Sequence, residues 1–374
     1  MPDVVRNIQQ RDGAVANETL AQLSNWLIYS AIAVYLLAFF AYCAEWVWGG
    51  RSRVAVQSAA LVGAANESAE EKVLVGAGVG GSGRAGKGAA AGGGVDDAKL
   101  EALLAEESDD DGDVSGGNER ADMFGRMAVS LTVLAFVLHL ASVVARGMSV
   151  HRAPWGNMYE FSLAVTLVAA GVYLGFALRG KGRWLGIFMM LAVLTTLGVA
   201  VTELYTASAQ LVPALHSYWL IIHVSAAIVS FGALHVGFIS AVLYLFKDSR
   251  EKRVAAGREG GRLGAMLDRL PSAASLDKTA YRVNAVIFPL WTFAIICGAI
   301  WAENAWGHYW QWDPKETWAF ITWVAYAAYL HARSTAGWKG RRAAYISLVA
   351  FACFIFNYYL VNIFFNSMHS YAGV

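Results

Sequence analysis

The stretch WAENAWGHYWQWDPKETW, residues 301–318, holds five tryptophans between two strongly apolar runs. Its DPKE segment predicts a helix start: Asp313 can cap, Pro314 suits the first helical position, and Glu316 stands where a capping box places its second acceptor. An aromatic belt at the lipid headgroups is one alternative reading. A belt spreads its aromatics over many helix ends, whereas these cluster in one connection. The cluster therefore indicates a loop that holds a flat, apolar ligand.

The composition around this stretch is that of a membrane protein. The chain has 374 residues, of which 57% are hydrophobic and 15% charged, and its mean hydropathy is +0.44. Runs long enough to cross a bilayer occur at 24–46, 125–145, 158–178, 184–203, 218–245, 284–301, 315–332 and 343–365. Without water in the lipid core, such runs must satisfy their own backbone groups as helices. We predict an all-α polytopic membrane protein with about eight transmembrane helices.

The basic residues predict the orientation. They concentrate in the loops at 179–183, 247–283 and 333–342, and the alternate loops contain few. The positive-inside rule then places the Trp-rich loop on the extracytoplasmic face of the cytoplasmic (plasma) membrane, with both termini outside. A net charge of +1 gives no reason to expect a nucleic-acid partner.

The chain divides into three parts. An N-terminal segment with the first transmembrane helix (1–50) precedes a Gly-rich and acidic stretch (51–120), which contains GAGVGGSGRAGKGAAAGGG at 76–94. Because such a composition cannot bury enough apolar surface to fold, we predict a disordered cytoplasmic linker. A phosphate-binding loop is the alternative, but the glycine spacing is wrong and no Ser or Thr follows the lysine. Residues 121–374 form a membrane domain of seven helices.

Histidines stand at both ends of the predicted spans. His331 is seventeen residues beyond Pro314, or about 26 Å along a helix, near the cytoplasmic edge. An ionisable residue there is a functional candidate, although a histidine that reaches the interface beside Arg333 is the alternative. His223 lies one turn inside the fifth span and His369 follows the last, both on the outer side.

Two outer histidines that flank an aromatic platform can ligate the metal of a flat macrocycle from both faces. Imidazole suits iron, and porphyrin requires apolar walls, whereas zinc would need a denser set of ligands. Haem is the best-fitting ligand. Whether His216, His235 or His308 also takes part is left open. The three cysteines, Cys43, Cys297 and Cys353, form no CxxC pair, so they do not indicate thiol–disulfide exchange by this chain.

Several segments resemble one known family. WGHYWQWDPKETWAFITWVAYAAYLHAR resembles the signature of the haem-handling WWD proteins. LVPALHSYWLIIHV before it, FNSMHSYAG after it and GMSVHRAPWGNMYEF (147–161) resemble the CcsA/ResC-type subunit of the System II cytochrome c synthase, called CcsB in some lineages. The resemblance covers about 121–374 and omits the Gly-rich stretch.

The resemblance implies a role for each matching residue. His223 and His369 match the external ligands of haem iron, and His331 matches a membrane histidine that receives haem from the cytoplasmic side. The segment that binds haem on the outer face corresponds to Trp306, Trp310, Trp312 and Asp313. Asp313 has two readings, as a helix cap and as a haem-proximal residue; we favour the cap, with an indirect effect on haem. A separate ResB-like subunit is expected to supply the second ligand to His331.

The implied function is to present haem b outside the membrane for thioether attachment to the CxxCH motif of an apocytochrome c, together with a ResB-like partner, and to move haem across the membrane. The chain's share in this holocytochrome c synthase (haem lyase) reaction would be positioning, with no acid–base residue, and a thioredoxin-like protein would reduce the thiols. One alternative is a haem transporter or chaperone without ligation activity. Another is an electron-transfer cytochrome b with two histidine ligands.

Overall fold

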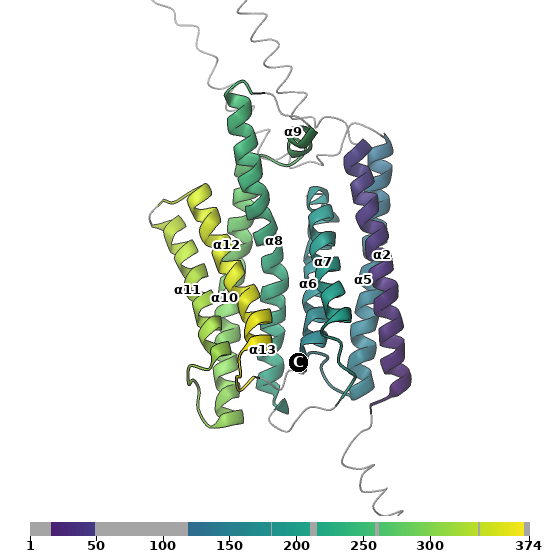
Figure 1. Cartoon of the computed structure of the whole chain (residues 1–374), viewed down its shortest axis with the longest axis vertical. Helices are drawn as coiled ribbons and strands as arrows, with labels where there is room; N and C mark the ends of the chain where they lie inside the picture. Colours follow the sequence, from purple (N-terminus) through teal and green to yellow (C-terminus); the bar gives the residue numbers. More distant parts are fainter. Residues whose placement is uncertain are drawn as a thin grey trace, which may run out of the picture.

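The computed structural model describes residues 16–48, 119–180, 182–209, 215–258, 262–335 and 337–369, and all regular elements within them are helical (Figure 1). The long helices are α2 (Glu18–Trp48), α5 (Glu119–Val150), α6 (Met158–Ala177), α7 (Gly186–Thr202), α8 (Tyr218–Ala255), α10 (Ala273–Trp306), α11 (Pro314–Ser334) and α12 (Arg341–Ile355). A π-helical turn, η3 (Phe356–Leu360), and α13 (Val361–Phe364) continue α12. Short elements η1 (Arg183–Leu185) and α9 (Arg262–Leu267) complete the order.

Each predicted span corresponds to one long helix, with η1 adding to α7 at 184–203 and η3 and α13 adding to α12 at 343–365, so the all-α membrane fold is confirmed. Seven of the described helices are long and apolar enough to cross a membrane. The remaining predicted span, 315–332, forms α11, which packs against α10 and α12 but does not reach the same apolarity. The predicted linker at 51–120 lies outside the described residues, except for Glu119 and Arg120, which begin α5.

Polar caps set the helix ends. The capping box predicted at the start of α11 is present, with the Asp313 side chain accepting a backbone N–H and Glu316 accepting the N–H of Asp313. The Asn157 and Ser217 side chains each accept one backbone N–H at the starts of α6 and α8. At its other end α10 stops at Gly307, whose φ of 80° is a left-handed conformation that favours glycine.

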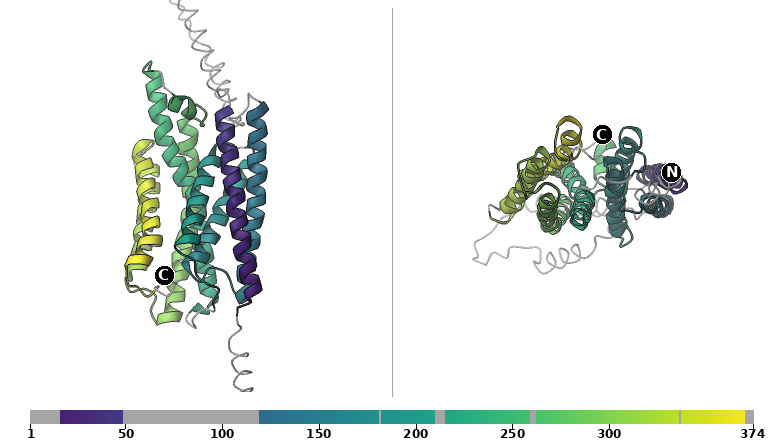
Figure 2. Two further views of the ribbon diagram at one scale, coloured as in Figure 1. Left: turned by 45° about the vertical axis from the view of Figure 1, so that its right-hand side comes forward. Right: turned by 90° about the horizontal axis from the view of Figure 1, so that it is seen from below.

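Successive long helices run in alternate directions (Figure 1). The start of α2 and the end of α13 therefore lie at the end of the bundle where residues 307–313 join α10 to α11, which we call the site end (Figures 1 and 2). Helix α8 is the most buried of the spanning helices. Small residues allow its close packing: a Cβ added at Gly232 would come within 2.7 Å of Val168 on α6.

At the opposite end, the segment at 247–283 is not a simple loop as predicted. Helix α8 continues to Ala255, and α9 packs back against it. The Lys247 ammonium donates to the Leu267 carbonyl, and Arg250 pairs with Asp268 at 2.9 Å. Helix α8 thus carries basic residues past the apolar bundle, and Lys247 and Arg250 form local contacts there.

Candidate functional site

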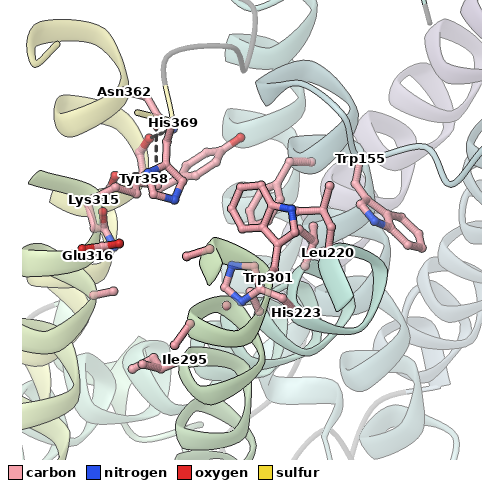
Figure 3. A pocket seen from close by; sticks show the side chains of 18 of the residues that line it. Trp155, Leu220, His223, Ile295, Trp301, Lys315, Glu316, Tyr358, Asn362 and His369 are labelled. Atoms are coloured by element: carbon pink, nitrogen blue, oxygen red, sulfur yellow. Dashed lines mark hydrogen bonds between the residues drawn. The ribbon is translucent and has the colours of Figure 1, made fainter. Parts of the chain in front are cut away.

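A cavity opens among the helices at the site end. It contains about 1220 Å³ of space free of protein atoms, including the open solvent at its mouth. Its wall is mainly apolar and aromatic and comes from α6, α8, α10, α11, α12 and η3. Figure 3 shows His223 and Trp301 on one side of the open space, with Lys315, Glu316 and His369 on the other.

His223 enters the cavity wall from the first turns of α8. Its Nδ1 lies 2.7 Å from the Ala294 carbonyl oxygen on α10. Because a carbonyl only accepts, Nδ1 must donate the proton, and Nε2 of the neutral ring carries the lone pair. This arrangement, in which one ring nitrogen is anchored by the backbone, is typical of metal-binding histidines.

Gly298 makes room for the His223 ring. A Cβ at this position would lie 2.7 Å from both Cε1 and Nδ1 of His223. That separation is too short for a van der Waals contact, so any larger residue at 298 must displace the imidazole. Glycine is thus required by the close approach of the ring to α10.

His369 is held by Asp313, although 56 residues separate them in the sequence. Its Nδ1 lies 3.1 Å from Asp313 Oδ2, and Asp313 Oδ1 accepts the Met368 N–H at 2.8 Å. Burial alone would raise the pKa of this carboxyl, but the hydrogen bonds from His369 and the Met368 N–H hold the pKa below its usual range. The carboxylate therefore stays ionised and fixes the proton of His369 on Nδ1, so that Nε2 carries the lone pair of the neutral ring.

One indole links the two histidines. Trp301 is 1% exposed; its ring is nearly parallel to that of His223 at 6.4 Å and meets that of His369 edge-on at 5.9 Å. Trp306 packs against both Trp301, at 4.8 Å, and His369, at 5.0 Å. The structure thus brings together His223, His369 and Asp313, which sequence analysis had singled out, around two tryptophans.

Trp310 and Trp312, from the same stretch, differ in whether they line the cavity. Trp310 lines the cavity, and its buried Nε1 has no hydrogen-bond partner in the part of the chain that the structure describes. Trp312 does not line the cavity: it is 64% exposed and adopts a φ of 62°, a conformation that is strained for a bulky residue. Its ring meets the edge of Trp310 at 5.7 Å. Trp312 therefore contacts Trp310, which lines the cavity, but does not line the cavity itself.

The other histidines lie away from this cavity. His331 is exposed at the opposite end of α11, as its spacing from Pro314 predicts. His235 is buried farther along α8, where its Nδ1 donates to the Phe231 carbonyl and aromatic rings pack on it. His216 is exposed before α8, and His308 packs near Trp306 at 6.4 Å. Neither His216 nor His308 lines the cavity.

The loop before α6 closes the cavity on another side. The Asn157 side chain caps α6 by accepting the Glu160 N–H at 2.8 Å, but the Glu160 carboxylate does not return to the cap residue. It is fully buried and instead pairs with Arg146 at 3.1 Å and Arg152 at 2.8 Å, and accepts the Gly156 N–H at 2.9 Å. These contacts fix Trp155 and Gly156 at the cavity wall.

Sequence analysis missed Gly298, Asn357 and the role of Lys315. For Lys315, the available signal in the sequence was a lone basic residue beside an aromatic cluster. No local pattern identifies Gly298, because its partner ring comes from another helix. Among the described residues, no group of three or more His, Cys, Asp or Glu is placed to hold a metal ion; the histidine pair is suited to a metal that arrives already chelated.

The arrangement defines a multi-pass membrane protein with an apolar, histidine-flanked cavity at one end of its bundle. Residues 155–369 match the family model described as "Cytochrome C assembly protein". The "Cytochrome c biogenesis protein CcsA" of Gloeobacter violaceus is 31% identical over 297 residues, 67% of this chain and 88% of that protein. The protein of the same name from Synechococcus elongatus is 41% identical over 195 residues, 43% and 60% of the two chains.

This chain belongs to the cytochrome c assembly protein family, and its role is in cytochrome c maturation. Among solved structures, "Cytochrome c Heme Lyase CcmF" matches with a TM-score of 0.53 and 17% identity, over 91% of this chain. The match spans 47% of the length of that protein, and at this low identity it shows a shared fold only. The predicted resemblance to CcsA-type proteins is confirmed.

Proposed function

We propose that the cavity holds haem b as a substrate, with the iron ligated by His223 and His369, and presents its vinyl groups for thioether attachment to an apocytochrome c. The observation that carries this proposal is the pair of imidazoles on opposite sides of one apolar cavity, each anchored through Nδ1. Both are oriented to offer Nε2 to a metal.

The residues present fit the substrate. The aromatic and aliphatic wall suits the porphyrin faces, and Gly298 leaves space for the ligand ring. Two buried indole N–H groups in the cavity wall, Nε1 of Trp310 and of Trp291, have no hydrogen-bond partner among the described residues and are available to donate to a ligand. Haem supplies the vinyl carbons that react with thiols, and the chain's own part is to fix the iron and exclude bulk water, a proximity effect.

The membrane setting completes the proposal. The site end faces the outside of the plasma membrane, because the opposite end carries the basic segments. A ResB-like subunit contributes the second ligand to His331, and haem reaches the cavity from that side. A thioredoxin-like protein keeps the apocytochrome thiols reduced, since the three free cysteines of this chain lie on different helices, α2, α10 and α12, and form no CxxC pair.

The proposed function can be tested by co-expression with a ResB-like subunit and a reporter apocytochrome that carries CxxCH. Covalent haem on the reporter, dependent on this chain and absent from an AxxAH reporter, is the expected result. Haem that co-purifies with this chain without any covalent product would contradict ligation and favour the transporter alternative. Haem that is never given up to the reporter would favour an electron-transfer cytochrome.

Gly298→Ala is expected to weaken haem retention at least several-fold. The new methyl group would overlap the His223 ring and break its hydrogen bond to Ala294. Gly198→Ala on α7 is the matched control, since a Cβ there meets nothing within 4 Å. Co-purified haem per protein, read from the Soret band, checks the prediction; equal haem in the two variants would refute the proposed fit of His223.

His331→Ala is expected to reduce the haem that the chain acquires in cells, while haem added to the purified protein binds the cavity with unchanged affinity. The reason is that His331 lies at the opposite end of α11 and outside the cavity wall. His216→Ala, an exposed histidine at the site end, is the control. Normal haem content in His331→Ala cells would remove His331 from the route.

A further inference from the structure

Lys315 places a positive charge in the wall of an otherwise mainly apolar cavity. Its Nζ donates to the Asn357 carbonyl at 2.9 Å and to Asn362 Oδ1 at 2.8 Å, and lies 5.9 Å from the centre of the Tyr358 ring. An ammonium has three N–H donors. These two hydrogen bonds hold the side chain in place and leave its third donor for the cavity.

The backbone around Asn357 is shaped for this contact. Residues 356–360 form the π-helical turn η3, a distortion in which i→i+5 bonding loosens the usual ladder and which is frequent at functional sites. The Asn357 carbonyl accepts from Lys315, while Asn357 Oδ1 is buried without a partner among the described residues. The turn thus gives the lysine neutral acceptors and no counter-charge.

No carboxylate of the described residues forms an ion pair with Lys315. Glu316 is adjacent, but its Oε2 accepts the N–H groups of Gln311 and Asp313. Asp313 is two residues earlier in the chain, but its oxygens accept hydrogen bonds from His369, Met368 and the Lys315 backbone. A charge buried in an apolar site is costly unless it is paired, so a ligand carboxylate is the partner that would stabilise the ammonium form of Lys315.

We propose that Lys315 binds a carboxylate of the substrate, the propionate side of the macrocycle, and so fixes which edge of the ring points into the protein. This inference rests on the proposed function. Figure 3 shows Lys315 beside Asn362 and Tyr358, across the open space from His223. Trp310, five residues earlier in the chain, also lines the cavity, and its buried Nε1–H has no partner among the described residues. With the carboxylates held at this wall, the vinyl edge is directed away from it.

The test is a spectroscopic titration of the full chain, in lipid nanodiscs, with haem and with haem dimethyl ester, whose carboxylates are neutral. Wild type is expected to bind haem about tenfold or more tightly than the ester, as charge-assisted hydrogen bonds are strong. Lys315→Met should bind both with similar affinity, and Lys315→Arg should restore part of the preference. Lys339→Met, an exposed lysine at the opposite end, should behave as wild type.

The outcomes separate the two proposals. A wild-type spectrum without two histidine ligands, with either compound, would refute the proposed function. Two-histidine spectra with equal affinity for haem and ester would refute the role of Lys315 alone. The ester bound to Lys315→Met serves as the folding control, because it needs His223 and His369 but no charge. A preference for haem that survives in Lys315→Met would likewise overturn the inference.

Discussion

His223→Ala is expected to abolish most of the haem that co-purifies with the chain and, with it, covalent haem on a CxxCH reporter. Loss of one hydrogen bond to a metal ligand typically costs about 10- to 100-fold in metal affinity, so loss of the ligand itself should cost more. The remaining haem should lose its low-spin, two-histidine spectrum. Haem content and spectrum of the purified protein, together with haem staining of the reporter, provide the measurement.

Chemical rescue separates a lost ligand from a misfolded chain. The alanine leaves space beside Trp301 and Gly298, and added imidazole can occupy it, so both signals should partly return. His235→Ala is the matched control, because His235 is on the same helix and buried, yet hydrogen-bonds only within α8 and lies outside the cavity wall. An unchanged reporter signal in His223→Ala would leave the cavity without its proposed ligand.

The sequence predicts those features that depend on neighbouring residues. The apolar runs locate the helices because bilayer thickness and backbone hydrogen bonding leave few alternatives. DPKE predicts the start of α11, since a cap acts within one turn. The position of His331 follows from the fixed rise of a helix. Each of these arguments uses residues fewer than about 20 positions apart.

The geometry of the cavity depends on longer-range contacts. The acceptor of the His223 proton is 71 residues away, and that of His369 is 56 residues away. No local periodicity specifies which carbonyl or carboxylate a ring will meet after the helices pack. For the same reason the sequence does not identify Gly298, whose role depends on the close approach of the His223 ring from α8. Trp312 shows the converse: it belongs to the tryptophan cluster in sequence, but a left-handed backbone turns it toward the exterior.

Asp313 has one role that the sequence predicts and a second that only the folded structure shows. Sequence analysis assigned it mainly to the cap of α11, and the structure shows that role together with a direct hydrogen bond to His369. One carboxylate accepts from Lys315 N, Met368 N and His369 Nδ1. The side chain therefore ties the start of α11 to the segment that carries the second proposed ligand, so its two duties need to be separated by substitution.

Asp313→Asn is expected to keep the helix cap and lose haem. Asparagine caps as well as aspartate, so the melting temperature should change little. It has one acceptor oxygen in place of two and no charge, so it cannot serve all three donors, and haem affinity should fall roughly 10- to 100-fold. Asp313→Ala should also lose about 1 kcal/mol of stability with the cap. Thermal unfolding and haem titration measure the two effects on the same sample.

Ser272→Ala isolates the cost of a cap. Ser272 caps α10 at the opposite end of the bundle, where its side chain accepts the Ser275 N–H, so its loss should lower stability without changing haem affinity. If Asp313→Asn binds haem as wild type does while Asp313→Ala does not, the carboxylate charge has no part in holding His369. The cap would then be the whole contribution of Asp313. If both variants lose haem but only Asp313→Ala loses stability, the hydrogen bond to His369 is what positions the second imidazole, and the cap is a separate duty of the same side chain.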